Sequence, residues 1–217
     1  MDEPVDDVDE LAANLRDIAF ANAALGGAAP VARALRRLPV RRVLDVGSGL
    51  ADIPLRLVRE ARRRGAALEV TCLDRSEAML ALARAAAGDE PALRFVHADG
   101  ERLPFEDGSF DVVTCTLTLH HFDPPAAGAL LRELRRVARV TPLVCDLRRS
   151  PLAFAGTWLW SRTSRNRLTR HDAPLSVRRA YTPDEALALA RGAGWRSARV
   201  HREPFFRMML SDEPSIP

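Results

Sequence analysis

The chain has 217 residues, of which 47% are hydrophobic and 28% are charged, and its formal net charge is +3. This composition is typical of a globular domain and excludes a disordered chain, a collagen-like repeat and a small disulfide-stapled fold. All 32 of its Lys+Arg residues are arginine, which excludes Schiff-base and pyridoxal chemistry because both need a lysine amine. Three cysteines far apart in the sequence, Cys72, Cys115 and Cys145, indicate a reduced, cytoplasmic protein.

The N-terminal part of the chain predicts a helical lid. Residues 1 to 10 are acidic and do not resemble a secretory signal, and no later stretch approaches the roughly 20 apolar residues of a membrane span. Residues 11 to 38 are rich in Ala, Leu and Arg, with Gly26, Gly27 and Pro30 dividing them, so we expect two short helices that cover the core.

Short apolar runs then alternate with segments of helical spacing. The predicted strands are 42–46, 68–73, 93–97, 110–116 and 142–146, and the predicted helices between them are 50–64, 76–87 and 124–140. Strands that alternate with helices in this way favour a parallel, doubly wound α/β sheet of the Rossmann-like kind.

The alternation stops between residues 147 and 181 and then resumes. Thr182 can cap a helix that runs to Arg191, and segments 196–201 and 204–210 predict a closing hairpin. We therefore expect a seven-stranded, mostly parallel sheet with an antiparallel C-terminal edge hairpin. The expected organisation is a lid over 1–38, a core over 39–147 and 182–211, an inserted cap over 148–181, and a tail over 212–217.

A glycine turn follows the first predicted strand. Gly47 and Gly49 stand where a strand turns sharply into a helix and leave bare backbone for a ligand. A dinucleotide fingerprint would place a third glycine at position 52, but this chain has Asp52, whose carboxylate would repel a pyrophosphate and attract an amine. Asp45 and Asp52 therefore favour a nucleoside that carries an amino acid over a nicotinamide or flavin. The alternative role of both acids is to cap the turn.

Acids also end the next two predicted strands. Asp74 follows the second strand, at the position from which a carboxylate can accept hydrogen bonds from ribose hydroxyls. Asp99 and Gly100 follow the third, where an acid can accept from an adenine amine and the glycine lets the ring approach. Open α/β sheets bind their ligands at this edge.

Four motifs, 43–49, 73–76, 98–105 and 110–113, resemble those of class I S-adenosylmethionine-dependent methyltransferases, in the same order. The resemblance implies S-adenosylmethionine as the cofactor, with the glycines at its methionine, Asp74 at its ribose, and Asp99 with Gly100 at its adenine. Arg75 replaces the apolar residue that often stacks on adenine, and a guanidinium plane can take that role. The implied donor-binding residues are Asp45, Gly47, Ser48, Gly49, Asp52, Asp74, Arg75, Met79, Asp99, Gly100, Thr116, Leu117, Asn22 and Arg16.

The fourth predicted strand is followed by Leu119-His120-His121-Phe122, which resembles a stretch of quinone and small-molecule methyltransferases. A phenol titrates near 10 and an imidazole near 6.5, so a histidine beside the acceptor is a suitable base at neutral pH. We expect His120 to act as that base, with His121 second; the alternative is that each packs or caps the following helix. The Pro-Pro-aromatic grip of nucleic-acid methyltransferases is missing here, which argues against a nucleic-acid partner.

The inserted cap divides into an apolar part over 151–160 and an arginine-rich part over 161–179. An apolar wall beside guanidinium groups suits an aromatic or acyl acceptor that bears an acid, and it also suits peripheral contact with an anionic membrane surface. A packed cap helix with solvated arginines is the plainer alternative. The expected acceptor-binding residues are Trp158, Arg167, His171 and Arg179, and no metal site is expected.

The cap and the N-terminal segment also resemble bacterial methyltransferases associated with type III polyketide synthases and phenolic-lipid or quinone pathways. This narrower resemblance implies O-methylation of a phenolic or polyketide-derived hydroxyl, and it places Asn22 or Arg16 near the donor carboxylate. C-methylation of a quinol ring and a catalytically silent donor-binding module remain alternatives. The sequence leaves the acceptor and the oligomeric state open.

Overall fold

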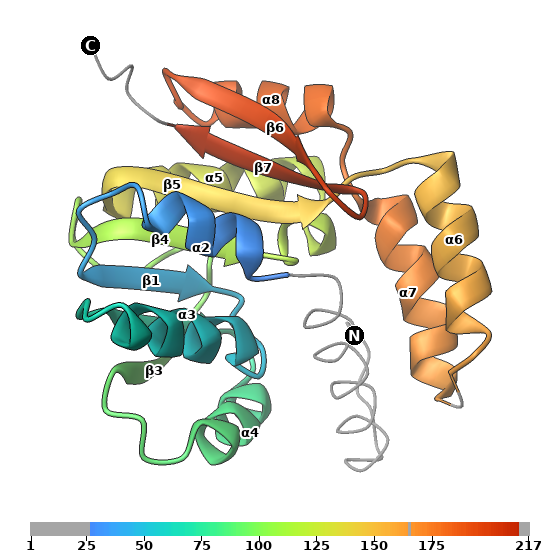
Figure 1. The fold of residues 1–217 in the computed structure, drawn as a ribbon. Helices are drawn as coiled ribbons and strands as arrows, with labels where there is room; N and C mark the ends of the chain where they lie inside the picture. The colour runs from blue at the N-terminus through green and yellow to red at the C-terminus, as the bar shows by residue number, and fades with distance from the viewer. Residues whose placement is uncertain (1–26, 165, 213–217) are drawn as a thin grey trace.

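The computed structural model describes residues 27–164 and 166–212. Seven strands form one sheet in the order β3-β2-β1-β4-β5-β7-β6 (Figure 1). The strands are β1 Arg42–Val46, β2 Glu69–Asp74, β3 Leu93–His97, β4 Phe110–Thr116, β5 Ala138–Leu147, β6 Ala198–Glu203 and β7 Arg207–Asp212. The first five pair in parallel, whereas β7 pairs antiparallel with both β5 and β6. The predicted sheet with its antiparallel edge hairpin is therefore confirmed.

Helices cover both faces of the sheet. They are α2 Ala29–Leu35, α3 Asp52–Arg63, α4 Glu77–Ala87, α5 Pro124–Val137, α6 Pro151–Ser161, α7 Arg167–Arg179 and α8 Pro183–Gly192, with a 3-10 turn, η1, over Leu119–His121. One core joins α5 and α8 to the sheet and includes Trp195, and the other joins α2 and α3 to the opposite face. Alternate residues of β1 divide between them, with Val43 on one face and Leu44 and Val46 on the other.

Several predicted boundaries differ from the observed ones, most clearly where α5 meets β5. The helical spacing from Pro124 predicts a helix to residue 140, but α5 ends at Val137 and β5 already begins at Ala138. Ala138 is extended and pairs with Phe110 of β4, and a register shift follows that pair. Pairing with a neighbouring strand has overridden local helical preference here.

The helix after the cap begins with a capping box. Thr182 accepts a hydrogen bond from the backbone of Glu185, and the Glu185 carboxylate accepts one from the backbone of Thr182. This arrangement satisfies two backbone donors that would otherwise lack a partner, and it fixes where α8 starts. The predicted cap residue is confirmed.

The helices α6 and α7 pack on each other and stand at the edge toward which the β1 and β5 arrows point (Figure 1). The two ends of the segment that carries α6 and α7 are joined, because the backbone N–H of Arg149 donates to the carbonyl of Tyr181 at 3.1 Å. The Tyr181 hydroxyl donates to the carbonyl of Phe122 at 2.7 Å, directly after η1. The cap is thereby tied to the turn that carries the two histidines.

Candidate functional site

The turn from β1 to α3 holds two glycines in different surroundings. Both have positive φ, +73° at Gly47 and +52° at Gly49, which favours glycine. A Cβ at Gly47 would lie 2.3 Å from Cγ2 of Thr118, so close packing against the turn after β4 also demands glycine there. A Cβ at Gly49 would meet no atom of the described residues within 4 Å. Gly49 therefore presents bare backbone to open space, as a ligand-binding turn requires.

Asp74 ends β2 and lies beside that turn. One carboxylate oxygen accepts from the backbone N–H of Gly49 at 3.0 Å, and the other accepts from that of Ser76 at 3.0 Å. Each carboxylate oxygen can accept two hydrogen bonds, so both keep capacity for hydroxyl donors. The two backbone bonds fix the carboxylate at the edge where β1 and β2 end.

Asp45 lies inside β1 and is 2% exposed. Its carboxyl accepts a hydrogen bond of 2.6 Å from the Thr114 hydroxyl of neighbouring β4. Burial raises its pKa to about 7, the Thr114 bond opposes this, and the charges of Asp52 and Asp74 raise it further. Asp45 is therefore a proton-binding group near neutral pH behind the glycine turn.

Ser48, between the two glycines, faces inward. Its hydroxyl donates to the Leu73 carbonyl at 3.3 Å, and its backbone N–H donates to the same oxygen at 3.1 Å. The structure thus directs these groups of Ser48 toward β2 and leaves Gly49 as the bare position of the turn.

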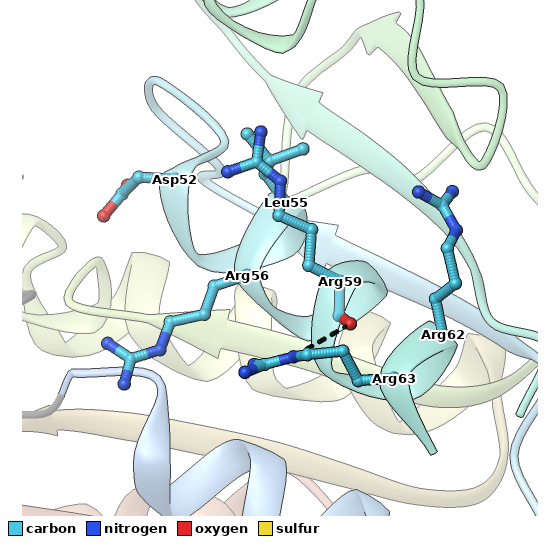
Figure 2. A pocket seen from close by; sticks show the side chains of 6 residues that line it. All are labelled: Asp52, Leu55, Arg56, Arg59, Arg62 and Arg63. Carbon is cyan, nitrogen blue, oxygen red and sulfur yellow. Dashed lines mark hydrogen bonds between the residues drawn. The ribbon is translucent and has the colours of Figure 1, made fainter. Parts of the chain in front are cut away.

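Asp52 is the first residue of α3 and lies at one end of a hollow of about 680 Å³ along that helix. Figure 2 shows this hollow, whose other lining residues are Leu55, Arg56, Arg59, Arg62 and Arg63. Arg62 forms an ion pair with Glu90 at 2.5 Å. Of the predicted donor-binding residues in the described structure only Asp52 lines this hollow, so most of its wall is a basic helix face.

The end of β3 carries the predicted adenine residues. Asp99 is exposed, and its carboxylate accepts from the backbone N–H of Glu101 at 2.9 Å. Gly100 is buried, and a Cβ there would approach side-chain carbons of Val46 and Leu130 at 3.0 and 3.1 Å. Packing against the core is therefore a second reason for glycine at this position, besides access for a ring.

Two further predicted donor residues follow β2. Arg75 is exposed, and its carbonyl oxygen lies 3.0 Å from Nε2 of His97 at the end of β3. Met79 is half-buried in the first turn of α4, where its backbone N–H donates to the hydroxyl of Ser76. The structure brings both beside the strand ends that carry Asp74 and Asp99.

The end of β4 contains a buried hydroxyl without a partner. Oγ1 of Thr116 makes no hydrogen bond to any residue between 27 and 212 that the structure describes. Leu117 follows with φ of +54°, a conformation that bulky residues rarely adopt, and Thr118 then donates to carbonyls of Gly47 and Thr116. An unpaired buried hydroxyl and a strained leucine beside the glycine turn are typical of a functional site.

His120 and Asp146 form a buried pair beyond this turn. Nδ1 of His120 lies 2.7 Å from Oδ1 of Asp146, and its backbone N–H donates to the second oxygen at 2.9 Å. Burial favours a higher pKa for the Asp146 carboxyl, but the His120 charge and hydrogen bonds, with the Leu147 N–H, lower it below the usual range. An ionised Asp146 can only accept, so Nδ1 of His120 donates to it, and in the neutral ring the lone pair is on Nε2.

The second histidine lies outside this pair. His121 is exposed, and its ring contacts that of His120 with centroids 4.2 Å apart. The structure therefore distinguishes the two histidines by burial, and the ring of His120 is fixed by the carboxylate of Asp146.

The predicted acceptor residues are spread over the two cap helices. Trp158 of α6 is 45% exposed and lies under the guanidinium of Arg162 at 4.6 Å. His171 and Arg179 of α7 are exposed, and His171 contacts Asp172 at 3.1 Å. Arg167 begins α7, and its side chain lies outside the described part of the structure, as do the predicted donor residues Arg16 and Asn22. The helix α7 contacts η1, so the cap borders the His120 turn.

Residues 43–141 match the family model described as "Methyltransferase domain". The matched residues are just under half of the chain. The match covers β1 to the first part of β5, and so includes the glycine turn, the acids of β2 and β3, and the histidine turn. The cap and the C-terminal hairpin lie beyond the matched residues.

Curated relatives of this chain carry the names of quinone methyltransferases. A demethylmenaquinone methyltransferase of Deinococcus radiodurans is 39% identical over 110 residues, which are 50% of this chain and 43% of the relative. A ubiquinone/menaquinone biosynthesis C-methyltransferase UbiE of Rickettsia felis is 38% identical over 100 residues, 45% of this chain and 40% of the relative. The chain matches less than half the length of these curated relatives.

Solved structures share the fold at low identity. PigF, solved with S-adenosylhomocysteine, aligns with a TM-score of 0.61 at 21% identity over 87% of this chain and 56% of PigF. The [4+2]-cyclase SpnF aligns with a TM-score of 0.53 at 20% identity over 74% of this chain and 52% of SpnF. The second case shows that the fold of a methyltransferase domain is also found in a protein described by another reaction.

Asp146, the partner of His120, is not among the residues that the sequence singles out. The two partners of the pair are 26 residues apart, and they meet because β4 and β5 are adjacent parallel strands. The available signal was that Asp146 ends a strand at the ligand-binding edge, as Asp74 and Asp99 do. Among the described residues no three His, Cys, Asp or Glu side chains gather to hold a metal ion.

Proposed function

We propose that the chain transfers a methyl group from S-adenosylmethionine to a small aromatic acceptor, with a phenolic hydroxyl as the target. The observation that carries this proposal is the arrangement along one sheet edge. Gly49, after β1, lies beside the fixed carboxylate of Asp74 at the end of β2. The buried His120–Asp146 pair lies at the ends of β4 and β5, one and two strands from β1. The family match over residues 43–141 supports the same reading.

The described residues fit the proposed donor. Gly49 offers backbone without a side chain, Asp74 keeps acceptor capacity for two ribose hydroxyls, and the Thr116 hydroxyl has no partner among the described residues. Asp52 supplies negative charge for an amine. The bound donor supplies an activated methyl group on a sulfonium, so the protein chiefly has to position the acceptor in line with it.

His120 is proposed to take the proton of the acceptor hydroxyl. Asp146 holds Nδ1–H, so Nε2 is the nitrogen that can accept the phenolic proton, and the carboxylate then stabilises the imidazolium that forms. The aromatic acceptor would lie against η1 under the cap, where Trp158 and the exposed His171 and Arg179 are the proposed contacts. Proton removal and methyl transfer together yield a methyl ether and S-adenosylhomocysteine.

The relatives favour a second candidate, C-methylation of a quinol ring. Their printed names include a demethylmenaquinone methyltransferase and a ubiquinone/menaquinone C-methyltransferase. The same base would then remove a quinol hydroxyl proton, which makes the ring carbon nucleophilic. The two candidates share every proposed residue and differ only in the acceptor atom that faces the donor.

The test is product analysis. The purified chain is incubated with S-adenosylmethionine and a panel of phenols and quinols, and products are examined by mass spectrometry and NMR. We expect a methylated product whose NMR signals assign the methyl group to oxygen; assignment to a ring carbon supports the second candidate. Donor binding without any methylated product across the panel would contradict both and support a silent donor-binding module.

A further inference from the structure

The exposed apolar side chains of this chain are concentrated in two segments. Within residues 27–164 and 166–212, the large hydrophobic side chains that are exposed are Leu152, Trp158, Leu159, Trp160, Phe205 and Phe206. Four belong to α6, where Leu152 is 73% and Leu159 67% exposed, and two form the tip between β6 and β7. A contiguous exposed apolar surface of this kind marks an interaction site.

The two segments are adjacent. The backbone N–H of Arg148, just before α6, donates to the carbonyl of Phe206 at 2.7 Å, and its guanidinium lies 5.8 Å from the Phe206 ring centre. Figure 1 shows the β6–β7 tip beside the chain that leads into α6. Phe205 and Phe206 have φ of +56° and +55°, an unfavourable conformation for aromatic residues, while their side chains remain exposed.

The segment that carries α6 and α7 is positively charged. Residues 148 to 181 contain eight arginines and one aspartate, a net charge of +7, whereas the whole chain carries +3. The rest of the chain is therefore net negative. Arg162 lies 4.6 Å above the Trp158 ring, which places a cation directly over an exposed aromatic side chain. Exposed tryptophan and leucine side chains with arginines nearby are typical of surfaces that contact a membrane interface.

We infer that α6 and the β6–β7 tip form a docking surface for an anionic lipid bilayer. The helix α6 has 11 residues and would lie in the plane of the interface, and no described helix is long and apolar enough to span a bilayer. A second copy of the chain fits this surface poorly, because a twofold contact would bring two regions of charge +7 together. An anionic lipid surface instead neutralises that charge while the apolar side chains enter the headgroup region.

Docking would place the site at the membrane. The helix α7 contacts both α6 and η1, so the turn with His120 lies one helix away from the docking surface. An aromatic acceptor dissolved in the bilayer could then reach the site without crossing water. This consequence rests on the proposed function, whereas the docking itself does not.

Vesicle binding tests the inference without donor or acceptor. The chain is sedimented with mixed phosphatidylglycerol–phosphatidylcholine vesicles and with pure phosphatidylcholine vesicles. We expect binding to the first and little to the second, with a blue shift of tryptophan emission as Trp160 leaves water. L152Q/L159Q should lower the partition coefficient at least about tenfold, because two exposed leucines would no longer enter the interface. Circular dichroism checks that this variant is folded, as expected for exposed positions.

A matched charge control separates docking from general attraction. R162Q/R170Q should weaken binding about fivefold for each arginine removed, whereas R56Q/R59Q, which removes two charges from the α3 face, should have a much smaller effect. Equal losses in the two variants, or no binding to phosphatidylglycerol vesicles at low salt, would overturn the inference. A dimer in analytical ultracentrifugation that L152Q/L159Q converts to a monomer would instead assign the surface to a second copy. Methyl transfer can be intact in each of these cases, so failure here is distinct from failure of the proposed function.

Discussion

The contact between His120 and Asp146 is the feature on which the proposed proton transfer depends. Both side chains are buried, at 5% and 1% exposure, and two hydrogen bonds join the carboxylate to one residue. Such a pair fixes both the ring orientation and the tautomer of the imidazole. Sequence reasoning found His120 but not its partner, because only the adjacency of β4 and β5 brings the two strand ends together.

His120→Gln is expected to lower kcat by about 10²- to 10⁴-fold, since a positioned base contributes roughly that factor. Asp146→Asn should also lower kcat and change the pH-rate profile, with KM for the donor largely unchanged, because it disturbs the ring rather than the glycine turn. Steady-state kinetics over pH measures both. His201→Gln, on exposed β6, is the matched control. Full turnover of His120→Gln at saturating acceptor would contradict the base role.

Asp45 makes the stability of the fold depend on pH. Its pKa is raised from 3.8 to about 7 in the folded state, mainly by burial. The folded chain therefore binds a proton that the unfolded chain lacks between these values, so the stabilising effect is full below the lower value and is lost as pH rises through the higher one. Above neutral pH the fold carries a buried carboxylate.

Asp45→Asn should remove this dependence, because the amide oxygen can still accept from Thr114 and does not ionise. Between acid and alkaline pH, the free energy of unfolding of the variant should rise relative to the native chain by up to about 4 kcal/mol. Urea denaturation of both proteins across this range measures the difference. Glu77→Gln on the surface serves as control. Parallel curves for Asp45→Asn and the native chain would show that Asp45 ionises at an ordinary pKa.

At the scale of elements, the decisive feature is the packing of the turn between β1 and α3 on the turn after β4. Gly47 packs on Thr118, whereas Gly49 faces open space, so two glycines in one motif have separate duties. The sequence predicted β1 and β3 at their observed bounds because both are short apolar runs between turn signals. It extended α5 by three residues, because pairing of Ala138 with Phe110 is not visible in local spacing.

Alanine substitutions should separate the packing role of Gly47 from the ligand-binding role of Gly49. Gly47→Ala combines a left-handed backbone with a clash, and we expect a loss of about 2 to 5 kcal/mol in unfolding free energy. Gly49→Ala should cost only about 1 to 2 kcal/mol but weaken donor binding about tenfold or more, because its methyl group occupies the ligand side. Urea denaturation and calorimetry with S-adenosylhomocysteine measure the two effects.

The control is Gly65→Ala, which has φ of +70° and open surroundings at the far end of α3. It should show the conformational cost alone, with donor affinity unchanged. Donor affinity that is equal in Gly49→Ala and Gly65→Ala would rule out a ligand at the bare side of Gly49.

At the scale of the whole molecule, the sheet edge is the proposed donor site and the cap is the proposed acceptor site. The sheet edge gathers Asp74, Asp99, Thr116 and His120 from the ends of β2, β3 and β4, and the cap is tied to that edge through Tyr181 and Phe122. Motif order in the sequence was enough to predict the sheet, because each motif stands at a strand end. The acceptor could not be predicted, because specificity depends on how α6 and α7 pack, and spacing does not determine that packing.

The central claim is that the carboxyl ends of β1, β2 and β3 bind an adenosine compound without phosphate. A crystal structure of the chain soaked with S-adenosylhomocysteine tests it most directly. The account predicts the ribose on Asp74, the adenine beside Asp99 and Gly100, and the amino-acid part along Gly49. Adenosine bound elsewhere, such as in the basic hollow along α3, or no bound compound at saturating concentration, would contradict it.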